Sequence, residues 1–254
     1  MTETIATTRP APHVALIELA NPPSNALNDA TRGALLAALE GLDGDLDLRA
    51  LVLTGAGGIF CAGDDLREVA ALNHRMKHRL AEFADLFARI ESFRVPVIAA
   101  IEGAAMGGGL ELALCCDIRL ASPDARFAAA GVNVGLMASV HRLPRLIGAA
   151  RAKAMLLTGR PVDAETALAY GLVTEIHPAR TLRQAALDLA RHIATRAPLS
   201  VEAAKRQIGR AIDIAPAEAQ ASQDEDLDRL LASADHREAV AAFLAKRQPI
   251  FTRS

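Results

Sequence analysis

The sequence predicts an α/β protein with a mainly parallel, helix-covered sheet that is followed by a helical region. Two short, wholly apolar runs, 50–54 and 97–101, fit strands that are buried on both faces, as in parallel sheets. Segments with the 3.6-residue periodicity of amphipathic helices alternate with these runs. From about residue 181 onward only helical patterning remains. Strand, turn and helix thus repeat in the order that a layered α/β core requires.

The elements of the first half follow one another in this order. Residues 14–19 predict a strand, which the turn-forming stretch 21–25 closes. A helix is expected over residues 29–42, where the leucines share one face. The buried run 50–54 then leads into a glycine-rich turn. A second amphipathic helix is expected over residues 75–90, before the strand at 97–101.

The second half begins with shorter elements. Residues 149–158 predict a helix, and Asp163 is expected to cap another helix that stops at Gly171. Residues 173–176 are the last strand candidate.

Prolines and serines divide the helical region that follows. We expect breaks at Pro198 and Pro216, and we expect Ser200 and Ser233 to act as helix caps. Because such helices cannot bury their apolar faces alone, this region is expected to dock on the core or on another subunit.

Composition restricts the class of protein. The 254 residues are 51% apolar and 3% aromatic, which suits one sizeable domain with an aliphatic core. A net charge of -2 gives no general attraction to nucleic acid or to an anionic membrane. No apolar run reaches the roughly eighteen residues of a membrane span. Residues 1–8 lack the pattern of a secretory signal and are expected to form a frayed tail, so the sequence predicts a soluble, cytoplasmic protein.

The three cysteines are expected to be free thiols in a reducing compartment. Cys61, Cys115 and Cys116 have no metal-ligand spacing, and the last two are adjacent in a segment predicted to be buried. The sequence therefore predicts no metal site.

Two glycine-bearing turns carry the functional information. Residues 60–66 read FCAGDDL, and residues 105–111 read AMGGGLE. Each turn is expected to follow a buried strand and to open a helix, so that free backbone N–H groups point at an anionic ligand. Two such turns can face one oxygen atom. A dinucleotide fingerprint is excluded, because Phe60 stands where its third glycine belongs, and no lysine of a P-loop follows.

Glu111 is the candidate acid/base. It falls in the first turn of the helix that the glycines 107–109 open. Leu110 and the run 112–116 predict an apolar neighbourhood, where a carboxylate is costly without a purpose. A solvated carboxylate favoured by the helix dipole is the alternative interpretation.

These motifs resemble those of the enoyl-CoA hydratase/isomerase superfamily, the crotonases. The similar segments are 25–28, 60–66, 103–117, 159–173 and 235–251. The resemblance implies the α/β crotonase (ClpP/crotonase-like) fold, a spiral of ββα units. It places the core at residues 1–195 and a helical oligomerisation region at 196–254, with a homotrimer or a dimer of trimers as the assembly.

The resemblance also implies the site. The backbone N–H groups of Asp64 and Gly108 would hold the thioester oxygen of an acyl-CoA, and Glu111 would move the proton. The other residues expected at the CoA-ester site are Ala26, Leu27, Ala62, Gly63, Asp65, Leu66, Arg67, Met106, Gly107 and Gly131. Among these, Asp65 is expected to support its turn by local hydrogen bonds, and Arg67 either meets the CoA phosphates or lies on a solvated helix face. The Asp64 side chain is left free by this assignment.

One departure from the family pattern concerns the second catalytic glutamate. The family's hydratases use a second glutamate about twenty residues after the first, and Gly131 occupies that position here. Isomerase activity that relies on the second carboxylate would be lost as well. His141 is a possible substitute, although a lone histidine in such a turn is more often a surface residue. Acyl choice is expected to depend on residues 72–76 and 131–141.

Hydration of a 2-enoyl-CoA, or the reverse elimination, is the first activity that the resemblance implies, with Glu111 as acid/base. Decarboxylation or thioester hydrolysis, which can run with one acid/base, is the second. A CoA-ester binder with little turnover is the third. No cofactor beyond the coenzyme A of the substrate is expected.

Overall fold

The computed structural model describes residues 4–71 and 76–254. Within these ranges the strands form one six-stranded and one three-stranded sheet. The larger sheet consists, in spatial order, of β1 (Ile5–Ala11), β2 (Val14–Leu19), β3 (Ala50–Gly55), β4 (Val97–Ile101), β6 (Ile118–Ala121) and β9 (Glu175–Ile176). β1 and β2 are antiparallel, and all later neighbours are parallel. The predicted α/β class is confirmed.

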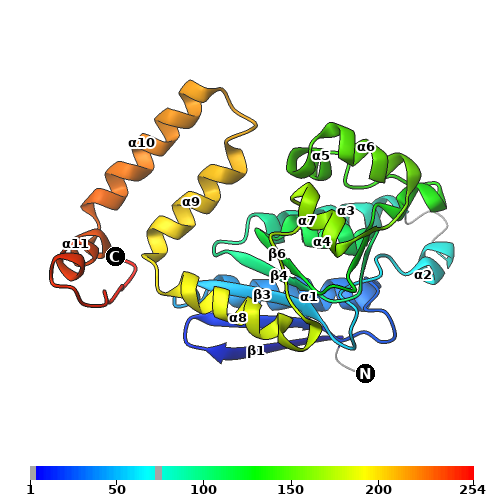
Figure 1. Cartoon of the computed structure of the whole chain (residues 1–254), viewed down its shortest axis with the longest axis horizontal. Coiled ribbons are helices and arrows are strands. Elements are labelled where there is room, and N and C mark those ends of the chain that lie inside the picture. Colours follow the sequence, from blue (N-terminus) through cyan, green and yellow to red (C-terminus); the bar gives the residue numbers. More distant parts are fainter. Residues whose placement is uncertain (1–3, 72–75) are drawn as a thin grey trace.

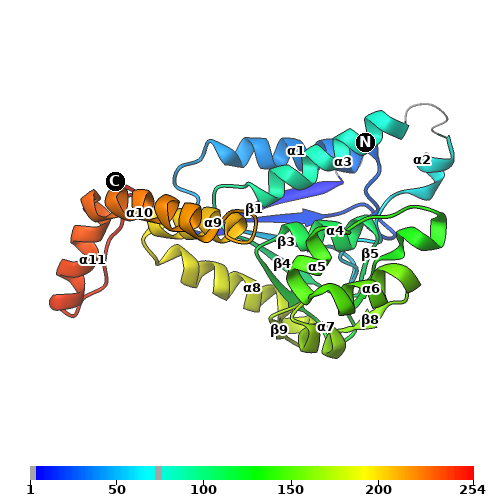
Figure 2. The ribbon, with the colours of Figure 1, turned by 90° about the horizontal axis from the view of Figure 1, so that it is seen from above.

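Helices cover both faces of the larger sheet. Successive residues of a strand point to opposite faces, so each central strand supplies two separate apolar clusters. One face packs on α8 (Ala179–Ala194), through side chains such as Val14, Val52, Ile98 and Leu187. The opposite face packs on α1 (Asp29–Asp43) and α3 (Met76–Glu91), through side chains such as Ile17, Leu53, Leu39 and Leu86. Figure 2 shows the sheet between these two helical layers.

The smaller sheet positions the second glycine turn. It consists of β5 (Ala104–Met106), β7 (Arg126–Ala128) and β8 (Val162–Asp163), with β7 in the centre. β5 leads directly into α4 (Gly108–Cys115), whose residues are almost all buried. The second motif therefore lies where the small sheet meets the main core.

The remaining helices lie around this core. They are α2 (Leu66–Ala71), the 3₁₀ helix Ala130–Val134, α5 (Arg142–Ile147), α6 (Ala149–Thr158), α7 (Ala164–Tyr170), α9 (Pro198–Arg210), α10 (Pro216–Ala232) and α11 (Ala234–Leu244). α9 to α11 extend away from one side of the core, as Figure 1 shows. Lys205 on α9 is tied to Asp117 of the core at 2.8 Å, and Arg145 on α5 pairs with Asp213 beyond α9. No helix among the described residues has both the length and the apolarity needed to cross a membrane.

Most predicted elements are confirmed within a residue or two, and two predictions are wrong. The expected frayed tail forms strand β1 from Ile5 onward, held by antiparallel pairing with β2. Ser200 does not cap a helix, because α9 already begins at Pro198, whose fixed φ suits the first helical turn. Ser233 does cap α11, accepting a hydrogen bond from the backbone N–H of His236.

Candidate active site

A backbone ladder joins the two glycine turns. The N–H of Phe60 donates to the carbonyl oxygen of Glu102 at 2.7 Å, and the N–H of Cys61 donates to that of Ala104 at 2.8 Å. The N–H of Met106 returns a bond to the Cys61 carbonyl at 3.0 Å. This pairing continues the strand order of the core into the two loops. It brings together turns that lie more than forty residues apart in the sequence.

The close approach of these turns places two amides side by side. Gly63 has φ 98°, and a Cβ there would lie 2.5 Å from the carbonyl oxygen of Met106 and 3.0 Å from the nitrogen of Gly108. The nitrogen of Asp64 lies 3.5 Å from the point that a Gly108 Cβ would occupy. In the part of the chain that the structure describes, neither amide donates to another loop or strand. Gly108 also begins α4, where N–H groups have no partner within the helix.

A third segment supports the first turn. Leu27 donates its N–H to the Gly63 carbonyl at 2.8 Å, and its side chain lies 3.6 Å from the Cβ position of Gly108. The buried Asn25 side chain donates to the carbonyl of Ile59 at 2.6 Å. The structure thus brings together five of the predicted site residues, Leu27, Gly63, Asp64, Met106 and Gly108.

Glu111 lies one turn along α4 from Gly108 and is 4% exposed. Its neighbourhood is not simply apolar, which corrects the sequence expectation. The Ser139 hydroxyl donates to one carboxylate oxygen, and the Arg142 guanidinium donates to the other. Ser139 is itself buried and has a positive φ of 60°. Both oxygens of Glu111 are therefore held by donors from one short segment.

Arg142 also connects Glu111 to α3. Its Nη2 lies 2.9 Å from Oε2 of Glu91, and this pair is more exposed than the pair with Glu111. Burial by itself lowers the pKa of Arg142, but its hydrogen bonds with Glu91 and Glu111 raise the pKa above its usual value. Arg142 is therefore a permanent cation between two carboxylates.

The Asp64 side chain is not free, contrary to the sequence expectation. Nε of Arg79 lies 3.3 Å from Oδ2 of Asp64, and Nη2 of Arg79 donates to Oδ1. Arg79 comes from α3 and is 3% exposed. It also donates to Glu68 of α2. A buried arginine thus forms a forked ion pair with the partly exposed side chain of the residue expected to contribute the first amide.

The predicted role of Asp65 is confirmed. Its carboxylate accepts the N–H of Arg67 at 2.9 Å and fixes the start of α2. Arg67, Leu66 and Ala62 are exposed on this side of the turn. Their contacts with a ligand stay predictions, as do those of Ala26.

The turn at Gly131 is tight around the position of a side chain. A Cβ there would lie 3.0 Å from the carbonyl oxygen and 3.2 Å from the carbonyl carbon of Leu136. The Leu136 N–H donates to the Gly131 carbonyl at 2.8 Å, so the turn closes on itself. The chain beyond this turn delivers Ser139 and Arg142 to Glu111, whereas the exposed His141 lies at the start of α5. The interpretation of His141 as a surface residue is confirmed, whereas the contacts of Ser139 and Arg142 with Glu111 were not predicted.

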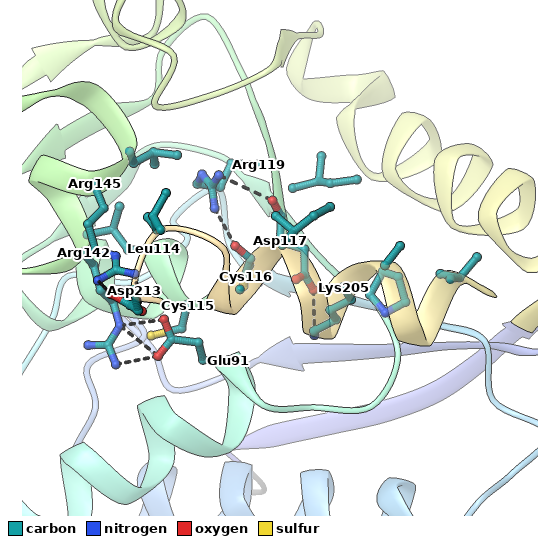
Figure 3. A pocket seen from close by; sticks show the side chains of 18 of the residues that line it. Glu91, Leu114, Cys115, Cys116, Asp117, Arg119, Arg142, Arg145, Lys205 and Asp213 are labelled. Atoms are coloured by element: carbon teal, nitrogen blue, oxygen red, sulfur yellow. Dashed lines mark hydrogen bonds and ion pairs between the residues drawn. The ribbon is translucent and has the colours of Figure 1, made fainter. Parts of the chain in front are cut away.

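A separate cleft of about 750 Å³ opens between the core and α9. Figure 3 shows its polar lining, where Arg142 meets Glu91 and where Lys205 meets Asp117. Asp64, Gly108 and Glu111 are not among its lining residues. Arg142 is the link, because it lines this cleft and also contacts Glu111. The expected acyl-selecting stretch 72–76 lies outside the described residues, except for Met76, which begins α3.

Known proteins resemble this chain over nearly its whole length. Residues 10–254 match the family described as enoyl-CoA hydratase/isomerase. A 2,3-dehydroadipyl-CoA hydratase of Escherichia coli is 36% identical, with 94% of each chain covered. A short-chain-enoyl-CoA hydratase of Clostridium acetobutylicum is 33% identical, with 92% of each covered.

Solved structures give the same result. The crystal structure of an enoyl-CoA hydratase from Bacillus anthracis superposes with a TM-score of 0.96 at 33% identity, covering 99% of this chain and 100% of that one. The chain belongs to the enoyl-CoA hydratase/isomerase family.

Proposed function

We propose that the chain hydrates a 2-enoyl-CoA, or runs the reverse elimination, with Glu111 as acid/base. The observation that supports this most is the placement of the amides of Asp64 and Gly108, which donate to no other loop or strand among the described residues, beside a helix that carries a buried carboxylate one turn further on. Amides aimed at a developing oxyanion are usually the largest single contribution to such a reaction, and losing one typically costs about 10²–10³ in rate. Names of the relatives support the same substrate class.

The proposed steps balance with one carboxylate. Glu111 takes a proton from water as the water oxygen bonds to C3 of the enoyl group. The C2–C3 electron pair moves toward the thioester, whose oxygen becomes an enolate oxygen between the N–H groups of Asp64 and Gly108. Glu111 then gives its proton to C2, which yields the 3-hydroxyacyl-CoA and restores the carboxylate. These reaction steps need no metal or redox group.

A second reaction class is favoured by the crowding at Gly131. Because this position is a glycine, whose Cβ would lie 3.0 Å from the Leu136 carbonyl oxygen, it supplies no equivalent of the second carboxylate that the resemblance implies for hydratases. Decarboxylation or thioester hydrolysis uses the same pair of amides with one acid/base. These activities belong in the same substrate screen.

Turnover measured by mass spectrometry tests the proposal. Wild type and Glu111→Gln are compared on crotonyl-CoA and on longer, branched and carboxylated CoA esters. We expect hydration by the wild type and a loss of about 10²–10⁴ in the variant. Loss of a carboxyl group or of CoA without hydration would select the second reaction class. Binding of every ester without any product would identify a binder and contradict both.

We further propose that α9 to α11 form an interface between copies of the chain, as a trimer or a dimer of trimers. Large apolar side chains on this region are strongly exposed, including Phe243 at 82% and Leu244 at 75%. Light scattering of wild type and Phe243→Asp is the test, and a monomeric wild type would contradict the proposal. We also propose a cytoplasmic location, which the three free thiols support.

A further inference from the structure

Asp64 presents an electrostatic problem for an oxyanion site. Its backbone N–H is proposed to hold the thioester oxygen, yet the same residue carries a carboxylate. Through the short Asp side chain, that carboxylate lies within roughly 6 Å of an oxygen bound at the N–H. Two unit negative charges at about this distance repel enough to change a rate by roughly 10²-fold, at the effective dielectric typical of sites near a protein surface. A carboxylate here needs compensation.

Arg79 supplies a positive charge at this point. Its fork grips both Asp64 oxygens, through Nε at 3.3 Å and through Nη2. The side chain of Arg79 is only 4% exposed, whereas that of Asp64 is 27% exposed. Its guanidinium lies over the ring of Phe83, with the guanidinium carbon 5.6 Å from the ring centroid. The guanidinium is therefore held in one position and is not a mobile, solvated side chain.

The surrounding charges make this cation necessary. Glu68 lies on the other side of the Arg79 fork and also accepts from Arg32 of α1. Arg32 is equally buried; it also pairs with Asp29 and Glu82 and donates to the backbone carbonyl of Leu27 at 2.9 Å. Both arginines thus contact Glu68, and Arg79 is the one of the two that pairs with the carboxylate of the oxyanion residue.

We propose that Arg79 is a positioning residue that neutralises the Asp64 carboxylate and fixes the Asp64 N–H, so that negative charge can develop on the bound thioester oxygen. This inference rests on the proposed pairing of the Asp64 and Gly108 amides. It adds to that pairing a dependence on α3, an element that contributes no atom to the oxyanion contact.

The test is a rescue experiment. Arg79→Met is expected to lower kcat by roughly 10–100-fold with a smaller change in KM, because the charge matters most when the oxyanion forms. Adding Asp64→Asn to Arg79→Met is expected to restore most of the loss, since the uncompensated charge is removed and the N–H is kept. A purely structural role for Arg79 predicts no such recovery. Arg79→Lys keeps the charge but loses the two-point contact, so we expect a loss of kcat that is smaller than that of Arg79→Met.

Arg32→Met is the matched control. It removes an equally buried arginine from the same network, but one that pairs with Glu68, Glu82 and Asp29. Asp64→Asn should therefore not rescue it. Thermal unfolding of each variant separates loss of fold from loss of rate, and Arg79→Gln takes the place of Arg79→Met in the rescue experiment if Arg79→Met does not fold.

A second readout does not depend on hydration. A 3-oxoacyl-CoA ionises to an enolate with its own near-ultraviolet absorbance, and the bound enolate fraction reports charge stabilisation in the site directly. Arg79→Met should lower that fraction, and Asp64→Asn should restore it. Absence of hydration with this pattern intact would reject the proposed reaction and keep the inference. Normal hydration with an unchanged enolate fraction in Arg79→Met, or no rescue by Asp64→Asn, would overturn the inference.

Discussion

Replacing Arg142 by Met tests whether its ion pair with Glu111 supports both the fold and the catalytic rate. The change removes the cation that donates to one oxygen of a carboxylate with a side chain 6% exposed, and leaves only the Ser139 hydroxyl. Breaking a buried pair by removing one partner costs about 3–5 kcal/mol. The Arg142 side chain is 13% exposed, so we expect a loss of stability at the lower end of this range. The bond to the half-exposed Glu91 adds little.

The expected loss is visible in both stability and rate. About 3 kcal/mol corresponds to a fall in Tm of roughly 6–12 °C for a chain of this size. A carboxylate that is free to move by about 1 Å is expected to lower kcat by roughly 10²-fold. Calorimetry measures the first effect, and turnover of the best CoA ester from the screen measures the second. Arg142→Lys, which retains the charge, should lie between the wild type and Arg142→Met on both measures.

Arg145→Met is the control for this prediction. Arg145 lies one turn further along α5 and pairs with Asp213 at an exposed position. Exposed ion pairs contribute little, so this variant should melt and turn over like the wild type. If Arg142→Met behaves like Arg145→Met, the argument from the buried pair is refuted.

Three further changes probe the packing around the site. Gly109→Ala would place its Cβ 2.1 Å from the Cys61 carbonyl oxygen, so we expect a clear loss in Tm and a loss of rate of about 10²–10³ from the displaced amides; a variant with normal kcat contradicts the close contact. In Gly131→Glu the new Cβ would lie 3.0 Å from the Leu136 carbonyl oxygen, so we expect a lower Tm and no gain in hydration rate. A higher hydration rate would show that the turn opens readily to admit the glutamate. Burial raises the pKa of the Cys61 and Cys116 thiols to about 12, which leaves roughly 10⁻⁴ of each as thiolate at pH 8. Iodoacetamide should therefore label them in urea but not in the native protein, and rapid native labelling would contradict their burial.

Local patterns were sufficient for the elements of the core. The apolar runs at β3 and β4 are buried at every residue, so their sequence signal had no competitor. Asp163 and Gly171 mark the cap and the end of α7, because each makes its contact within its own turn. β1 was missed, since its exposed residues alternate poorly and its order depends on pairing with β2.

The site was predictable only where backbone geometry decides it. Glycines 63 and 108 lie where two segments of the backbone approach closely, and the glycine-rich motifs in the sequence indicate such an approach. The partners of Asp64 and Glu111 lie 15 to 31 residues away along the chain, and no periodicity connects them. Ion pairs of this kind depend on how α3 and α5 pack on α4. The sequence therefore predicted the close approach of the two turns, but not the charged side chains that hold Asp64 and Glu111; the roles of the two amides and of Glu111 stay predictions.

The two unpaired amides also provide a label-free reporter of binding. Backbone N–H groups without a partner exchange with solvent deuterium rapidly, whereas the neighbouring N–H groups of Cys61 and Met106 are bonded within the ladder. A thioester oxygen held between the N–H groups of Asp64 and Gly108 should slow exchange at those two positions before any chemistry occurs. Hydrogen exchange resolved by NMR could thus follow occupancy of the oxyanion site in variants that no longer turn over.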